Sequence, residues 1–62
     1  MTIADKNAYN ARCSGKWRIY SATCQWGIVL YAPETNEFRE MYYCAYRDDF
    51  WQTVDAMCGH GR

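Results

Sequence analysis

Residues 27–46 read GIVLYAPETNEFREMYYCAY, and this stretch decides the fold that we expect. It opens with a β-branched and aromatic run from Gly27 to Tyr31, and an aromatic-rich stretch begins at Phe38. Between the two runs, Pro33 sets φ for the second position of a turn and Asn36 tolerates a left-handed conformation. The pattern therefore predicts a β-hairpin with strands near residues 26–32 and 37–46.

A further strand is predicted near residues 16–22. Charged and apolar residues alternate there, which turns Trp17 and Ile19 toward the interior and Lys16 and Arg18 outward. We expect this strand to complete an antiparallel sheet of about three strands.

The C-terminal part of the chain predicts a helix near residues 49–58. Asp49 and Gln52 have the spacing of a capping box, and Gly59 stands where a helix favours a left-handed C′ residue. Alanines at helical spacing favour a second, short helix near the N-terminus, although two asparagines oppose it. The predicted fold class is α+β, with the C-terminal helix packed on one face of the sheet.

The chain length of 62 residues predicts one domain, spanning residues 1–62, with a thin core. Half of the residues are hydrophobic and the formal net charge is zero, so the chain is neither a disordered polyelectrolyte nor a polycation suited to nucleic acid. It has no secretory h-region and no run of eighteen apolar residues, which predicts a cytoplasmic protein that does not enter membranes. The apolar residues expected in the core are Trp17, Ile19, Trp26, Ile28, Leu30, Met41, Phe50, Trp51, Val54 and Met57.

Four cysteines, at positions 13, 24, 44 and 58, leave three readings open. Free thiols packed in the core suit a cytoplasmic protein. A disulfide between Cys24 and Cys44 is the second reading, because the hairpin register would place these residues opposite each other. Zinc is the third, but the cysteines lack the close C-x2-C spacing of structural sites, so we expect no metal and no cofactor.

Catalysis has little support in the sequence. His60 is the only histidine, and we expect its Gly-His-Gly setting to leave it without fixed partners. The adjacent carboxylates Asp48 and Asp49 are explained by a helix N-terminus. The chain also lacks a glycine-rich loop for phosphate, so we expect that it is not an enzyme.

Two surfaces are candidates for binding. The tyrosine-rich return strand offers exposed aromatic side chains, which are enriched at protein interfaces. We expect it to form a protein-binding site together with nearby carboxylates; the predicted set is Tyr42, Tyr43, Tyr46, Glu37, Glu40, Asp48 and Asp49. The alternative is a basic and aromatic strand that binds single-stranded nucleic acid through Lys16, Trp17, Arg18 and Tyr20.

The general character of the chain, which is small, aromatic-rich and free of catalytic motifs, is similar to that of the small phage proteins that bind and block host enzymes, anti-CRISPR proteins included. The resemblance is one of type and assigns no residue a role. It implies a non-catalytic protein-binding module that inhibits sterically in the host cytoplasm, as a monomer or a dimer. A zinc- or disulfide-stabilised structural piece remains a further alternative.

Overall fold

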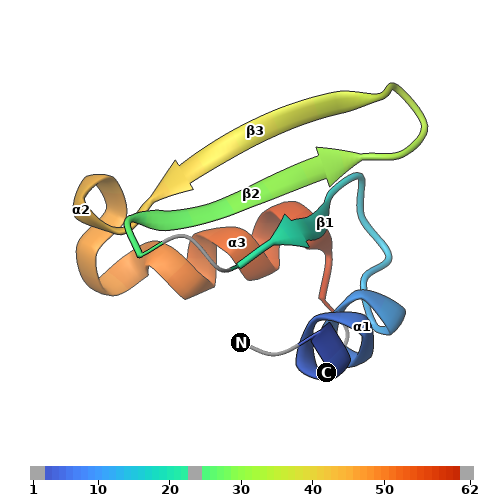
Figure 1. Cartoon of the computed structure of the whole chain (residues 1–62), viewed down its shortest axis with the longest axis horizontal. Coiled ribbons are helices and arrows are strands. Elements are labelled where there is room, and N and C mark those ends of the chain that lie inside the picture. The colour runs from blue at the N-terminus through green and yellow to red at the C-terminus, as the bar shows by residue number, and fades with distance from the viewer. Residues whose placement is uncertain (1–2, 23–24, 61–62) are drawn as a thin grey trace.

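The computed structural model describes residues 3–22 and 25–60, and its centre is the predicted hairpin (Figure 1). Strands β2 (Gly27–Ala32) and β3 (Glu37–Tyr42) pair antiparallel, and β1 (Arg18–Ser21) pairs antiparallel with the other side of β2. The strand order is β1-β2-β3. The predicted α+β class, with a three-stranded antiparallel sheet, is therefore confirmed.

The turn between β2 and β3 has the predicted left-handed residue. Asn36 adopts a φ of 57°, a conformation that asparagine tolerates better than most other residues with a side chain. Ala32 then lies opposite Glu37, which fixes the register along the hairpin. Local turn chemistry thus sets which side chains share each face of the sheet.

One face of the sheet is buried under α3 (Phe50–Cys58), which runs behind the sheet in Figure 1. The pair Ile28 and Met41 and the pair Ile19 and Leu30 point toward this helix, and each side chain is at most 2% exposed. The buried hydrophobic cluster consists of Cys13, Ile19, Ile28, Leu30, Met41, Phe50, Val54 and Cys58. Burial of these side chains supplies most of the stabilisation that so small a domain has.

The two ends of α3 differ from each other in how well the sequence predicted them. At the C-terminal end Gly59 is left-handed, with a φ of 58°, and its N–H donates to the Ala56 carbonyl, as predicted. At the N-terminal end the predicted capping box is wrong, because the Asp49 side chain makes no cap hydrogen bond. A 3₁₀ turn, η1 (Arg47–Asp49), leads into the helix instead.

Strand β3 ends four residues earlier than predicted. Residues 43–46, expected in the strand, form a helical turn, α2 (Tyr43–Tyr46). The pairing partner runs out at this point, where the N–H of Tyr43 donates to the carbonyl of Trp26 just before β2 begins. The rings of Tyr43 and Tyr46 then pack on Phe50, with centroids 4.5 and 6.2 Å from its ring. This aromatic packing directs the chain under the sheet.

Two tryptophans assigned to the core by sequence are largely exposed. Trp26 is 67% exposed because it precedes β2, where strand alternation no longer fixes its direction. Trp51 is 42% exposed, since the buried positions of α3 are Phe50, Val54 and Cys58 at i, i+4 and i+8. The predicted N-terminal helix is present as α1 (Ile3–Ala11).

Candidate functional site

The face of the sheet opposite α3 is not covered by any helix among the described residues (Figure 1). We call it the open face. Because directly paired residues point to the same side of an antiparallel sheet, the register assigns most of its side chains. Tyr20 lies at the irregularity between Ile19 and Ser21, and its ring contacts with Tyr31 and Phe38 place it on the same face. The side chains of the open face are Arg18, Tyr20, Val29, Tyr31, Phe38, Glu40 and Tyr42.

Three aromatic rings, one from each strand, meet on the open face. Tyr20 lies edge-on to Tyr31 and to Phe38, with centroid distances of 5.8 and 5.1 Å. Tyr31 and Phe38 are cross-strand partners with rings 6.5 Å apart. Tyr20 is 55% and Phe38 57% exposed, although apolar burial would favour covering them. These three residues form the aromatic cluster, which is held together by ring contacts and presented to solvent.

A hollow lies on each side of the aromatic cluster. One, of about 370 Å³, is lined by Tyr20 and Tyr31 together with Lys6 and Asn10 of α1. The other, of about 240 Å³, is lined by Trp26, Val29, Glu40 and Tyr42, among others. The open face is therefore uneven, with aromatic side chains beside recesses that would accept protruding groups of a partner.

The structure divides the predicted protein-binding set into separate groups. Tyr42, which is 46% exposed, lies on the open face and its hydroxyl donates a hydrogen bond to the Glu40 carboxylate. Glu37 belongs to the opposite side of the sheet and pairs with Lys16. Of the predicted residues, only Tyr42 and Glu40 therefore belong to the open face.

The other predicted residues lie beyond the end of β3. Tyr43 and Tyr46 pack on Phe50, with Tyr43 37% exposed and Tyr46 half-buried. Asp48 and Asp49 are exposed in η1. The sequence analysis grouped these residues with Tyr42 and Glu40 because it extended the strand to residue 46, whereas residues 43–46 are helical.

Phe38 and Trp26 are site residues that sequence reasoning missed. The signal for Phe38 was present, since a hairpin turning near Thr35 places it opposite Tyr31. For Trp26 the sequence offered no such signal, since it precedes the strand and its hydrophobicity alone favoured the core.

The basic strand of the alternative hypothesis is largely occupied by contacts within the chain. Lys16 Nζ lies 3.0 Å from Glu37 Oε1 and 5.3 Å from the centroid of the Trp17 ring. Arg18 Nη1 donates to the carbonyls of Gly15 and Trp17, each at 2.8 Å. Hydrogen bonds from Thr35 and Lys16 hold the pKa of Glu37 below its usual value, so the carboxylate keeps its charge for this pairing. Of the two aromatic residues in the predicted set, Tyr20 is 55% exposed, whereas Trp17 is partly buried against the core.

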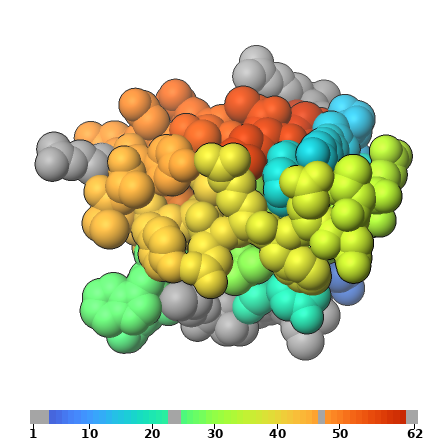
Figure 2. Space-filling model, turned by 90° about the horizontal axis from the view of Figure 1, so that it is seen from above, coloured from blue at the N-terminus to red at the C-terminus, as the bar shows by residue number. Residues whose placement is uncertain are grey.

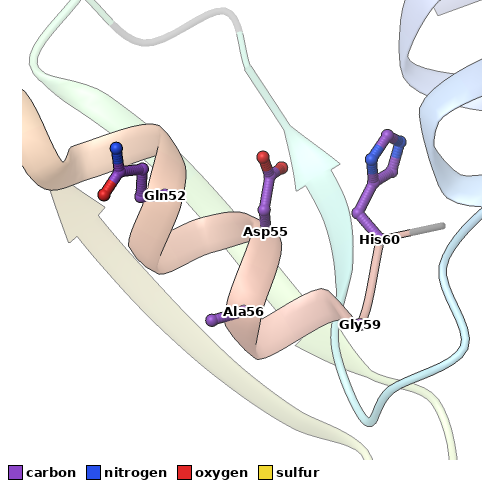
Figure 3. A pocket seen from close by; sticks show the side chains of 5 residues that line it. All are labelled: Gln52, Asp55, Ala56, Gly59 and His60. Atoms are coloured by element: carbon purple, nitrogen blue, oxygen red, sulfur yellow. The ribbon is translucent and has the colours of Figure 1, made fainter. Parts of the chain in front are cut away.

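A third hollow, of about 370 Å³, lies at the C-terminal end of α3. In Figure 3 the side chains of Asp55 and His60 point in the same direction beside it, with Gln52 one turn away. The hydroxyl of Tyr9, on α1, donates to Asp55 Oδ1 at 2.5 Å. The Tyr9 ring stacks on His60 with centroids 4.0 Å apart.

This arrangement orders His60, which the sequence had led us to expect without fixed partners. Its N–H donates to the Asp55 carbonyl at 3.1 Å, and it forms an isolated β-bridge with Cys13. Burial, and secondarily the hydrogen bond to Asp55, raise the pKa of Tyr9, so its phenol stays a proton donor. The Asp55 carboxylate is therefore engaged in joining α1 to α3.

Two of the cysteines lie in the core beneath this junction. Cys13 and Cys58 are buried free thiols that interact with each other, as the first of the three readings predicted for them. Burial raises the pKa of both and brings that of Cys58 to about 12, which makes the reactive thiolate scarce. Cys44 is an exposed free thiol on α2, so it is neither a core residue nor on a strand facing Cys24. Cys24 lies outside the described residues.

Within residues 3–22 and 25–60, no three His, Cys, Asp or Glu side chains lie close enough to hold a metal ion. None of the helices in the same ranges has the length and apolarity needed to cross a membrane. The sequence matches no protein-family model, and neither a curated protein nor a solved structure is significantly similar to it.

Proposed function

We propose that this chain is a small, non-catalytic protein-binding module that blocks its partner sterically, as phage inhibitors of host proteins do. The observation that carries the proposal is the aromatic cluster on the open face, where Tyr20 and Phe38 are each more than half exposed. Exposed aromatic groups that are fixed by one another bury much area on binding at a low entropic cost.

The charge pattern favours a protein over a nucleic acid as the partner. Binding of single-stranded nucleic acid combines aromatic stacking with free cations that follow the phosphate backbone. Here Arg18 donates to backbone carbonyls, Lys16 pairs with Glu37, and the carboxylate of Glu40 lies on the open face itself. An acidic group beside the aromatic cluster would repel phosphates, whereas a protein surface with polar and basic groups would accept it.

A cross-linking experiment tests this proposal. A photoreactive phenylalanine analogue replaces Tyr20 in one variant and, as a matched control, the similarly exposed Trp51 on α3 in another. Both variants are irradiated in an extract of the host cells in which the chain acts. We expect a discrete protein adduct from position 20 and none from position 51.

Affinity measurements then examine the partner that the cross-link identifies. Tyr20→Ala and Trp26→Ala should each weaken binding by about 30-fold, equivalent to ~2 kcal/mol at an aromatic hot spot. Unchanged affinity in both variants, with the melting temperature retained, would contradict the proposal. An adduct that disappears after nuclease treatment, with affinity falling steeply as salt rises, would instead assign the open face to nucleic acid.

A further inference from the structure

Strand β3 forms one edge of the sheet, and its outer side has no neighbouring strand among the described residues. Figure 2, which views the molecule from above, shows the atoms of β3 in front, uncovered by the helices. Edge strands carry unpaired N–H and C=O groups that can pair with another strand. The charges and the hydrogen-bond phase of this edge define which strand would fit it.

One contact at the end of the hairpin shows which residues of β3 direct their backbone N–H and C=O groups toward β2 and which direct them outward; we call this alternation the hydrogen-bond phase. Tyr43 N–H donates to the carbonyl of Trp26, while Gly27 and Tyr42 are direct partners, so the pair Gly27–Tyr42 is not itself hydrogen-bonded. Pairs alternate along an antiparallel ladder, which directs the backbone groups of residues 37, 39 and 41 toward β2. Those of Phe38 and Glu40 therefore point outward from the edge.

This phase restricts how β3 can pair with a second copy of itself. A residue whose backbone groups point outward must lie opposite another such residue. The two-fold axis therefore lies between two copies of the same residue, which face each other directly. The two sheets then join with their open faces on the same side. Centring the pairing on Glu37, Arg39 or Glu40 brings identical charges face to face, which is destabilising.

Centring it on Phe38 has the opposite effect. Glu37 of each copy then lies opposite Arg39 of the other, which gives two complementary charge pairs, and both side chains are exposed. The two Phe38 rings become cross-strand neighbours on the open face. The aromatic cluster of one copy then lies beside that of the other, so each Phe38 ring covers part of the exposed apolar surface of its counterpart.

We propose that two copies of this chain associate through antiparallel pairing of their β3 edges, centred on Phe38. The result is a six-stranded sheet with both α3 helices on one face and a continuous aromatic stripe on the other. The contact is short, because only residues 37–39 are strand in both copies, so we expect a Kd on the order of 100 µM. The association shares Phe38 with the aromatic cluster but does not depend on the proposed function, because the backbone edge of β3 can pair whether or not the open face binds another protein.

Sedimentation equilibrium with charge-reversal variants tests the register. Wild type should dimerise between about 10 µM and about 1 mM. Arg39→Glu and Glu37→Arg should each be monomeric at the same concentrations, because each places like charges opposite each other. An equimolar mixture of the two should form a heterodimer, and the double variant Glu37→Arg/Arg39→Glu should dimerise with itself.

Lys16→Ala provides the matched control. It removes the intrachain pair with Glu37 but keeps the edge charges, so it should dimerise like wild type. Cooperative thermal melting verifies that each variant is folded. If Glu37→Arg fails that check, Glu37→Lys replaces it. The proposal is overturned if wild type stays monomeric, if the single variants still dimerise, or if neither the mixture nor the double variant regains dimerisation.

Discussion

Val54 on α3 is the residue whose truncation tests most directly how the helix holds the sheet. Its side chain is 0% exposed and belongs to the cluster that joins the helix to the strands. Val54→Ala removes two buried carbons, which costs about 1.6 kcal/mol at about 0.8 kcal/mol each. A residual cavity of roughly 50 Å³ adds about 1 kcal/mol. We therefore expect a loss of about 2–3 kcal/mol, a large fraction of the stability of a domain this small.

Thermal unfolding followed by circular dichroism measures this loss. A fall in Tm of roughly 10–20 °C is expected, since 1 kcal/mol shifts a domain of this size by about 4–8 °C. Gln52→Ala is the matched control on the same helix, because Gln52 is exposed, and it should stay within about 0.5 kcal/mol of wild type. Val54→Thr keeps the shape but buries a hydroxyl, and it should cost about 1–3 kcal/mol. A Tm for Val54→Ala within about 4 °C of wild type would refute the docking of α3 described above.

Three further predictions concern backbone contacts, pH and cysteine chemistry. A Cβ at Gly27 would lie 1.8 Å from the carbonyl oxygen of Met41, so Gly27→Ala should separate β2 from β3 and abolish cooperative melting; a variant that melts like wild type would contradict this close approach. Because burial raises the pKa of Cys58 from 9.0 to about 12, the folded state holds this proton more tightly than the unfolded state, so stability is fully present below pH 9.0 and falls as pH rises toward 12. Urea unfolding across this range should show a smaller loss in Cys58→Ala than in wild type, and equal slopes would contradict the assignment. Reductant and EDTA should each leave Tm unchanged, since neither a crosslink nor a metal is expected to stabilise the fold. A drop of several degrees with reductant would indicate a disulfide, and the same drop with EDTA would indicate a bound metal.

The sequence could predict those parts of the fold that depend on local chemistry. The hairpin follows from Pro33 and Asn36 between two strand-forming runs, and the end of α3 follows from Gly59. The exposed positions of Tyr20 and Tyr42 follow from alternation along short strands. In each case the determining residue lies within a few positions of the structure that it sets.

Other features were decided only by contacts between distant segments. Trp26 and Trp51 are hydrophobic enough for the core, but Ile28 and Phe50 are the residues that are buried there. The strand stopped at Tyr42 because β2 offered no further partner, which separated the predicted tyrosine site. His60 was ordered by Tyr9, a residue from the opposite end of the chain.

The sequence by itself therefore determined the hairpin, the strand before it and the helices at the two ends of the chain, because turn chemistry and alternation act over a few residues, but it did not determine α2. Tertiary structure alone decided which face of the sheet stayed open and which aromatic side chains meet there. The physical reason is that α3 can cover only one face, and the face that it covers depends on the summed packing of Ile19, Leu30 and Val54. No single residue in the aromatic cluster encodes that choice.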